Sequence, residues 1–568
     1  MIKKALVAVL IVVCVCLPLF GAGQSDKSAS SSMGFHATGF PVVDNPVTIR
    51  VVWARGATHV KNPNEMIVPS QGNKQMNVNV EWIAVAGESW AEKINLMLAS
   101  GDLPDTFAAA IGSDFSVATQ GESGAFLPLQ NLIDKYAPNI KSILAKRPIL
   151  KPWITSPDGN IYAIFKLNEG SWCTLGPIQF LQKKWMQKMG LGAKDMPDSL
   201  DKFYDLLMKA KNAGDLNGNG KADEIPLGFM FQDFSQGLAN FFYAHGLPIE
   251  DGFNDNRDYL IVKDGKVVYS PTTTAFKDTM KDLNRFYAAG LLDPEGFSQT
   301  YGQYSAKIKQ DQYFSFAQWW AQNLVPTERW DDYVYVTNIP AKGYKYVTNY
   351  RFSWSRTVAP ISAKTKYPEV VMRWIDYWYD PVKSIEVMEG PIGVRVEKKA
   401  DGTYGVLPTP AGLGLAEWRD LETLGPGGLT SIDAEMYQKL FNFAAAEMCG
   451  TVKYDYYSPY WPEEFWPQPA LSAEELKTQQ ALLPDIQALV KKTMAKWITE
   501  GKIDQEWDQF QSQLQTIGLP KLMDIWQKSY TVFLQRAGGR MTKPHTVGTN
   551  EPYPGGWGTE PGSRLKGK

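Results

Sequence analysis

The chain has 568 residues, which is too long for one hydrophobic core and indicates two domains. Its composition, 44% hydrophobic and 21% charged, is that of a globular protein and excludes a disordered or fibrous chain. The formal net charge of −2 gives no basic face, so we expect no nucleic-acid partner.

The N-terminus predicts a signal peptide over residues 1–23. Two lysines precede an apolar segment, and small residues form a cleavage site before polar Gln24. Cys14 and Cys16 lie in this segment, but each follows a valine where a lipidation signal has a small residue. We expect simple cleavage and an exported protein, periplasmic or at the cell surface. The sequence leaves open whether the protein has a lipid anchor.

The folded part is expected to follow a flexible Ser- and Gly-rich tether over residues 24–44. Apolar residues alternate over residues 47–53 and again over residues 78–82, which predicts two strands. The segment between these strands is expected to hold a helix or loop.

A helix is predicted next, from Ser89 to Ser100. Ser89 and Glu92 have the spacing of a capping box, and Gly101 ends the helix. A strand over residues 106–111 follows. Strand, helix and strand in this order indicate a βαβ unit and a parallel sheet, so the fold class is α/β.

Later helices are indicated by apolar residues at i, i+3 and i+4. They cover residues 200–211, 371–378, 486–497 and 507–517. Beyond residue 536 the chain is rich in Gly, Pro and polar residues, which predicts a flexible tail. Two cysteines remain after signal cleavage, Cys173 and Cys449, and the sequence leaves open whether they pair.

One local motif predicts a metal site. Oxygen-bearing side chains at loop positions 1, 3 and 5 followed by glycine at position 6 suit a hard cation. Position 12 is Pro226 rather than glutamate, so the loop is not an EF-hand, and acids at positions 9 and 10 replace it. We predict a structural Ca²⁺ bound by Asp215, Asn217, Asn219, Lys221 (through its carbonyl), Asp223 and Glu224.

Enzymatic motifs are weak. The sequence has four histidines and no glycine-flanked nucleophile elbow. Acid pairs at residues 331–332 and 463–464 are typical of solvated surfaces and only weakly suggest a glycosidase dyad. We therefore expect no enzymatic activity.

Aromatic residues, 12% of the chain, gather in three segments: 314–323, 350–354 and 454–466. Aromatic rings stack on sugar rings, and the planar amide and guanidinium groups beside them hydrogen-bond sugar hydroxyls. These segments are candidates for a carbohydrate site, although most aromatic side chains of a large protein belong to its core.

Several separated segments resemble the family 1 extracellular solute-binding proteins of carbohydrate ABC importers, especially the large branch that includes alginate-oligosaccharide binders. The resemblance spans about residues 45–535 in the family's order. Phe165 and Lys184 depart from the family pattern, which has proline and aspartate there. The segments that carry it are residues 98–105, 158–164, 182–191, 215–227, 507–519 and 525–530.

The resemblance implies the two-lobed periplasmic-binding-protein fold of type II, with central sheets flanked by helices and a hinge between the lobes. We expect the chain to cross between lobes near residues 160–165, 338–345 and 357–363. The first lobe would comprise residues 45–162 and 341–362, the second residues 163–340 and 363–535, and the flexible tail residues 536–568.

The resemblance also implies a ligand and partners. A monomer would capture an oligosaccharide in the cleft and present it to the membrane subunits of an ABC importer. Trp319 and Trp320 match a position where the family places stacking aromatics. Further candidates are Trp172, Asp114, Arg351 and Trp354. Two alternatives are a calcium-stabilised carbohydrate-binding adhesin and a secreted carbohydrate-active enzyme.

Overall fold

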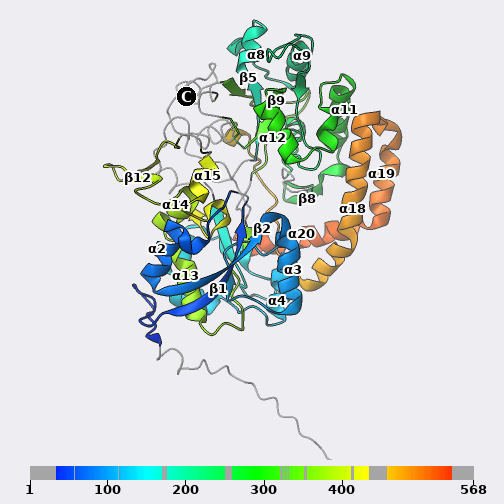
Figure 1. The fold of residues 1–568 in the computed structure, drawn as a ribbon. Coiled ribbons are helices and arrows are strands. Elements are labelled where there is room, and N and C mark those ends of the chain that lie inside the picture. Colours follow the sequence, from blue (N-terminus) through cyan, green and yellow to red (C-terminus); the bar gives the residue numbers. More distant parts are fainter. Residues whose placement is uncertain are drawn as a thin grey trace, which may run out of the picture.

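Two hydrophobic cores divide the chain into two α/β lobes, seen one above the other in Figure 1. The computed structural model describes residues 33–56, 58–112, 114–168, 176–249, 259–319, 324–325, 329, 332–350, 355–410, 413, 415–433 and 457–539. The predicted fold class, two α/β lobes with central sheets flanked by helices, is confirmed.

The first lobe has a mostly parallel sheet, as the βαβ pattern predicted. Two three-stranded sheets are joined where Thr106 and Ala110 bridge Ile361 and Val358. Of the six strands only β11 runs against the others. In order across the sheet they are β2 (Val78–Ala86), β1 (Val47–Arg55), β3 (Thr106–Phe107), β11 (Ser355–Val358), β4 (Ile164–Asn168) and β14 (Ser431–Ile432).

Helices cover both faces of this sheet because β1 is buried on both sides. Ile49 and Val51 face one core cluster, whereas Val52 faces another. The helices of this lobe are α2 (Ile67–Met76), α3 (Trp90–Ser100), α4 (Asp114–Glu122), α5 (Gln130–Tyr136), α6 (Pro138–Lys146), α7 (Leu150–Ile154), α13 (Pro368–Tyr377), α14 (Pro381–Glu389) and α15 (Leu415–Asp420). A small hairpin of β12 (Val396–Lys398) and β13 (Tyr404–Val406) projects beside α14 (Figure 1).

The second lobe has a four-stranded sheet in the order β10 (Tyr333–Tyr335), β5 (Ile178–Gln182), β9 (Tyr313–Gln318) and β6 (Ile225–Leu227). A separate hairpin, β7 (Leu260–Lys263) and β8 (Lys266–Tyr269), turns at Asp264 and Gly265, which both have positive φ. The helices here are α8 (Lys183–Lys188), α9 (Leu200–Lys211), α10 (Ala239–Ala244), α11 (Thr274–Ala288) and α12 (Tyr301–Lys309).

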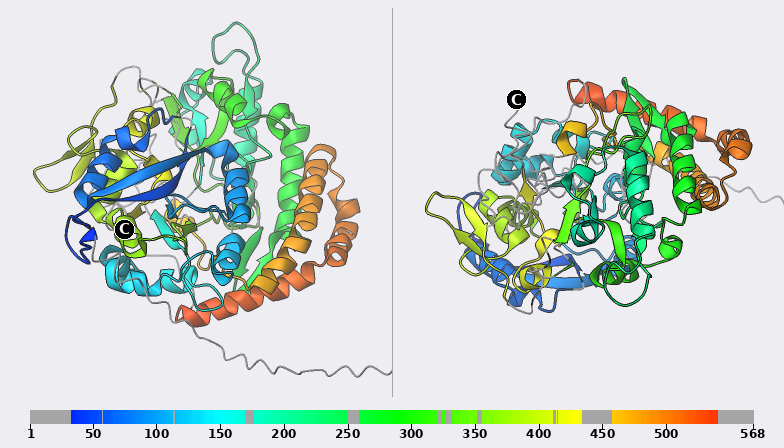
Figure 2. Two further views of the ribbon diagram at one scale, coloured as in Figure 1. Left: turned by 60° about the horizontal axis from the view of Figure 1, so that its bottom comes forward. Right: turned by 90° about the horizontal axis from the view of Figure 1, so that it is seen from above.

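Three C-terminal helices, α18 (Ala473–Glu500), α19 (Ile503–Ile517) and α20 (Leu519–Arg536), form a flank beside both lobes (Figures 1 and 2). The aromatic side chains of α20 divide between the cores, since Tyr530 belongs to the second-lobe core and Phe533 to the first-lobe core. The flank therefore ties the lobes together on one side.

The sequence-based lobe boundaries need correction. Residues 363–433 were placed in the second lobe, but α13 packs in the first-lobe core, where Trp374 meets Trp82 and donates a hydrogen bond from Nε1 to Asn73 Oδ1 at 2.9 Å. β4 also belongs to the first lobe, whereas Ala341 and Tyr346 pack in the second. An amphipathic pattern shows that a helix buries one face, but it does not show against which core.

Other local expectations were also wrong. Ser89 makes no capping hydrogen bond, because a 3-10 turn over Gly87–Ser89 leads directly into α3. The predicted strand over residues 106–111 is only two residues long. The end of the predicted tether is packed against the first lobe, since Val42 is fully buried and its amide donates to the Met76 carbonyl. By contrast, Ser199 caps α9, which spans the predicted residues 200–211.

Candidate functional site

The first-lobe sheet presents one edge to the second lobe. The chain leaves this sheet after β4 and after β14, and it re-enters at the start of β11, all at the carboxyl edge of the parallel strands. The predicted crossings near residues 160–165 and 357–363 were therefore wrong, because those residues lie at or within β4 and β11. The segments that follow β1 and β3 begin at the same edge, because β1 and β3 are parallel. Ligands bind at this edge in open α/β sheets.

The second-lobe sheet presents a matching edge. The register pairs Ile178 with Gln318 and Phe180 with Tyr335, so the start of β5 and the ends of β9 and β10 lie together. The chain enters β5 and leaves β10 there. The chain passes from the end of β4 to the start of β5, so both edges lie on the path between the lobes.

Two predicted ligand residues fall at these edges. Trp319 directly follows β9 and is half-buried. Asp114 is the first residue of α4 in the first lobe, just beyond the edge formed by β3. Trp172, Trp320, Arg351 and Trp354, like Cys173 and Cys449, lie outside the described residues.

A polar cluster after β1 was not predicted. Thr58 Oγ1 donates to Asp420 Oδ2 at 2.5 Å, and Arg419 Nε donates to Asp420 Oδ1 at 2.7 Å. His59 is 8% exposed, and its Nδ1 is 3.9 Å from Asp420 Oδ2. Its ring nitrogens have no hydrogen-bond partner within the described part of the chain. The cluster could have been suspected, because polar residues after a parallel strand lie at the ligand edge.

The second-lobe edge is backed by a row of amide and hydroxyl groups. Gln179 Nε2 donates to Ser315 Oγ at 2.7 Å, Asn240 Nδ2 donates to Gln179 Oε1 at 3.4 Å, and Tyr346 Oη donates to Asn240 Oδ1 at 3.0 Å. Nearby, Gln318 Nε2 donates to the Tyr301 hydroxyl at 3.1 Å. These bonds hold the start of β5 and the end of β9 in place, and Trp319 directly follows β9.

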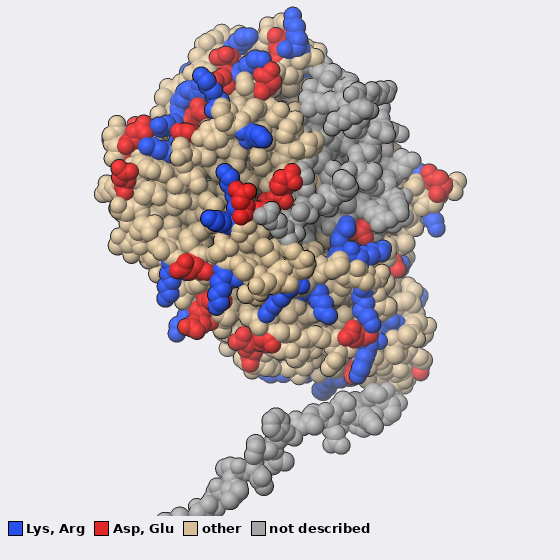
Figure 3. Space-filling model, turned by 180° about the vertical axis from the view of Figure 1, so that it is seen from behind, with Lys and Arg blue, Asp and Glu red and all other residues tan. Residues whose placement is uncertain are grey.

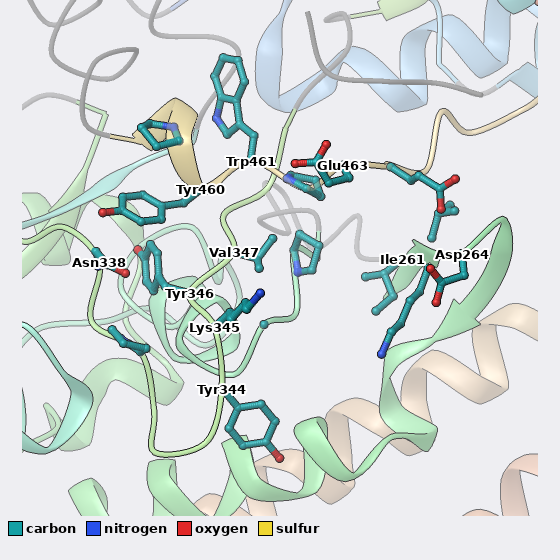
Figure 4. A pocket seen from close by; sticks show the side chains of 18 residues that line it. Ile261, Asp264, Asn338, Tyr344, Lys345, Tyr346, Val347, Tyr460, Trp461 and Glu463 are labelled. Carbon is teal, nitrogen blue, oxygen red and sulfur yellow. The ribbon is translucent and has the colours of Figure 1, made fainter. Parts of the chain in front are cut away.

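A cavity of about 750 Å³ lies where the second lobe meets the segments that cross to the first (Figure 4). Its walls come from residues 246–248, the β7–β8 hairpin, residues 338–347 and residues 459–464. Tyr460 and Trp461 belong to the third aromatic segment noted in the sequence. Its volume is that of a small-molecule site. Trp319 and Asp114 are not among its described lining residues.

The predicted calcium loop is folded into a tight coil by its own side chains. Asp215 accepts from the amides of Gly218 at 2.6 Å and Gly220 at 2.8 Å, and the Gly220 amide is the main reason that the pKa of Asp215 is lowered. Asn217 Oδ1 accepts from the Asn219 amide at 2.9 Å. Gly218 and Gly220 both have positive φ, which the sharp turns require.

The donor set of this loop suits Ca²⁺, with three carboxylates, two amide oxygens and the Lys221 carbonyl. In this conformation Asp223 accepts from Asn219 Nδ2 at 3.0 Å, while Glu224 accepts from the amides of Leu216 and Asn217. No three acidic, His or Cys side chains among the described residues are grouped for a metal. The residue types fit Ca²⁺, and the side chains of Asp223 and Glu224 would have to turn toward the ion to bind it.

The two separate cores and the chain segments that pass between their sheet edges define a two-lobed α/β fold. No family model matches the chain. It is 29% identical over 528 residues to the fructooligosaccharide ABC transporter substrate-binding protein FusA of Streptococcus pneumoniae serotype 4, an alignment that covers 90% of this chain and 95% of that protein.

Two solved structures of FusA are also similar to this chain. S. pneumoniae FusA in complex with kestose has a TM-score of 0.74 and 28% identity, covering 86% of this chain and 99% of that one. An EF-hand mutant of FusA in complex with fructo-nystose has a TM-score of 0.75 at the same identity and coverage. Over most of its length the chain is therefore similar to substrate-binding proteins of ABC transporters, as its sequence resemblance indicated. Within the described residues no helix is long and apolar enough to cross a membrane.

Proposed function

We propose that this chain captures an oligosaccharide of the fructooligosaccharide type between the two sheet edges and delivers it, as an exported monomer, to the membrane subunits of an ABC importer. The observation that carries the proposal is similarity over nearly the whole chain to FusA, whose structures hold kestose and fructo-nystose. The relatives are binding proteins, which supports a role in binding rather than in catalysis.

In the proposed site, the Trp319 ring stacks on a sugar ring from the second-lobe edge, and Trp320 extends this surface. Asp114, at the opposite edge, accepts from sugar hydroxyls. Trp172, Arg351 and Trp354 complete the contacts from the crossing segments. Closure of the lobes would exclude water and strengthen these polar contacts.

Charged side chains of the two signs are mixed on one face of the molecule. In Figure 3, Lys and Arg side chains are intermingled with Asp and Glu over the described part of both lobes, so that part of the surface has no large field of one sign.

The proposed Ca²⁺ in the 215–224 loop has a structural role. The loop belongs to the second lobe, where Lys188 Nζ donates to the Leu216 carbonyl and Asn217 Nδ2 donates to the Asp311 carbonyl at 3.3 Å, immediately before β9. The EF-hand mutant of FusA supports a metal loop in this class of protein, and that mutant still holds fructo-nystose. Calcium would therefore stabilise the lobe without contacting the sugar.

The test is calorimetric titration of the mature chain from Gln24 with kestose, and with maltotriose as a comparison sugar. We expect kestose to bind and Trp319→Ala to weaken binding at least tenfold, which is about 1.4 kcal/mol. Phe40→Ala is the matched control, since Phe40 is an exposed ring of the first lobe whose neighbour is Tyr377, away from both edges. Equal affinity in Trp319→Ala would exclude the stacking role, and an absence of kestose binding would refute the ligand class.

A further inference from the structure

The cavity beside the crossing segments has features that the proposed cleft does not use. It is bounded by the β7–β8 hairpin, by residues 246–248 and 338–347 of the second lobe, and by residues 459–464, which link the lobes (Figure 4). Its volume of about 750 Å³ falls within the range of about 300–1,000 Å³ that small-ligand sites occupy.

Aromatic rings form one wall of this cavity. Tyr346 and Tyr460 meet edge to face, with ring centroids 5.6 Å apart, and both line the cavity. Tyr346 is 5% exposed, its hydroxyl is bonded to Asn240, and burial raises its pKa. Trp461 is 3% exposed and packs on Tyr350 with centroids 4.7 Å apart, so it lines the cavity as a fixed, buried ring. Tyr460 is half-buried, and a fixed ring of this kind loses little entropy when a sugar stacks on it.

Positively and negatively charged side chains surround the opening of the cavity. Lys345 and Glu463 are exposed and lie on different segments of the chain, while Asp264 projects from the hairpin turn (Figure 4). Lys263 and Lys345 carry two positive charges and Asp264, Glu463 and Glu464 three negative ones, so the lining has a formal charge of 2 − 3 = −1. Donors and acceptors without an excess of positive charge suit hydroxyl groups and disfavour phosphates and uronates.

We propose that this cavity is a second carbohydrate-binding site, which takes a neutral sugar of up to three rings by stacking on the half-buried ring of Tyr460, which Tyr346 holds in place. The inference rests on the proposed function, because the same sugar class would supply its ligand. Residues 459–464 link the lobes, because Tyr460 packs on the second-lobe core and Trp461 belongs to the first-lobe core. A sugar bound here therefore touches a segment that moves with the lobes, so the two sites are coupled and each sugar changes the affinity for the other by the same factor.

The test uses the mature, calcium-saturated chain labelled with 5-fluorotryptophan and titrated with kestose. Calorimetry counts the binding events, and fluorine NMR follows Trp461, whose resonance is assigned by its absence in Trp461→Phe. We expect two events, with the Trp461 resonance moving to saturation in the weaker one.

A blocking variant separates the two sites. Val347 lines the cavity, and Val347→Trp fills it, whereas Lys342→Trp places the same ring at an exposed position of the same segment that does not line the cavity. We expect Val347→Trp to weaken the second event at least tenfold and Lys342→Trp to leave it unchanged.

The outcomes are distinct for the two proposals. A single event at one equivalent that persists in Val347→Trp, with a stationary Trp461 resonance, would overturn the second site and leave the proposed function intact. A single event abolished by Val347→Trp but not by Trp319→Ala would support this cavity and refute the cleft assignment. No binding at all would refute both.

Discussion

Asp376 provides a quantitative test of how burial shifts a carboxyl group in this protein. It lies on α13, is 2% exposed, and reaches the N-terminus of α6. Oδ1 accepts from the Ile140 amide at 2.9 Å, and Oδ2 accepts from the Asn139 amide at 3.3 Å and from Asn139 Nδ2 at 3.1 Å. These bonds favour the charged form, but desolvation outweighs them and raises the pKa of Asp376 from 3.8 to about 6.

The sign and size of the effect follow from linkage. Because the folded state holds the proton more tightly than the unfolded state, the stabilisation by Asp376 is fully present below about pH 4. It is lost as pH rises to about 6 and then stays constant. A shift of about 2 units corresponds to roughly 3 kcal/mol in the free energy of unfolding.

The perturbation is Asp376→Asn, which cannot titrate. Its Oδ1 still accepts from Ile140, but its Nδ2 faces the two donors of Asn139, so we expect a destabilisation whose direct cost does not depend on pH. Urea unfolding curves from pH 4.0 to 7.5 should therefore show wild type losing roughly 3 kcal/mol relative to the variant between about pH 4 and 6. Asp134→Asn, an exposed acid of α5, is the control and should follow wild type. Parallel curves for wild type and Asp376→Asn would show that the pKa of Asp376 is not raised.

Two further predictions concern the second lobe. Asp293 is 1% exposed and accepts from Lys307 Nζ at 2.7 Å and from the Tyr313 hydroxyl at 2.5 Å, so Asp293→Ala should cost about 3–5 kcal/mol by urea unfolding, with Asp293→Asn costing less because it keeps an acceptor. Equal losses in the two variants would contradict this account. Removal of Ca²⁺ by a chelator should lower the unfolding temperature of wild type, since calcium at 100 times its dissociation constant adds about 2.7 kcal/mol. The unfolding temperature of Asp215→Asn should not depend on the chelator. The control is Asp198→Asn, at an exposed acid outside the loop, which should keep the chelator effect. A chelator effect of equal size in Asp215→Asn would show that the metal binds elsewhere.

The sequence determined the local structure wherever a short-range physical rule applies. The alternation of apolar residues along β1, the Ser199 cap of α9 and the glycines of the 215–224 loop each depend on neighbours only a few residues away. The resemblance in separated segments was enough to predict the class of protein. The Asp264–Gly265 hairpin turn could also have been recognised, because Asp-Gly between alternating apolar residues favours this turn.

Only the tertiary structure decided which core each element joins. The buried faces of β4 and α13 would suit either lobe, and their place depends on long-range pairs such as Trp374 with Trp82. The polar cluster of Thr58, His59 and Asp420 joins residues about 360 positions apart, and no local pattern brings such residues together. The same holds for the cavity, whose walls come from four separate segments. Burial is a property of the whole chain, so the composition of a site from distant segments is fixed only when both lobes are folded.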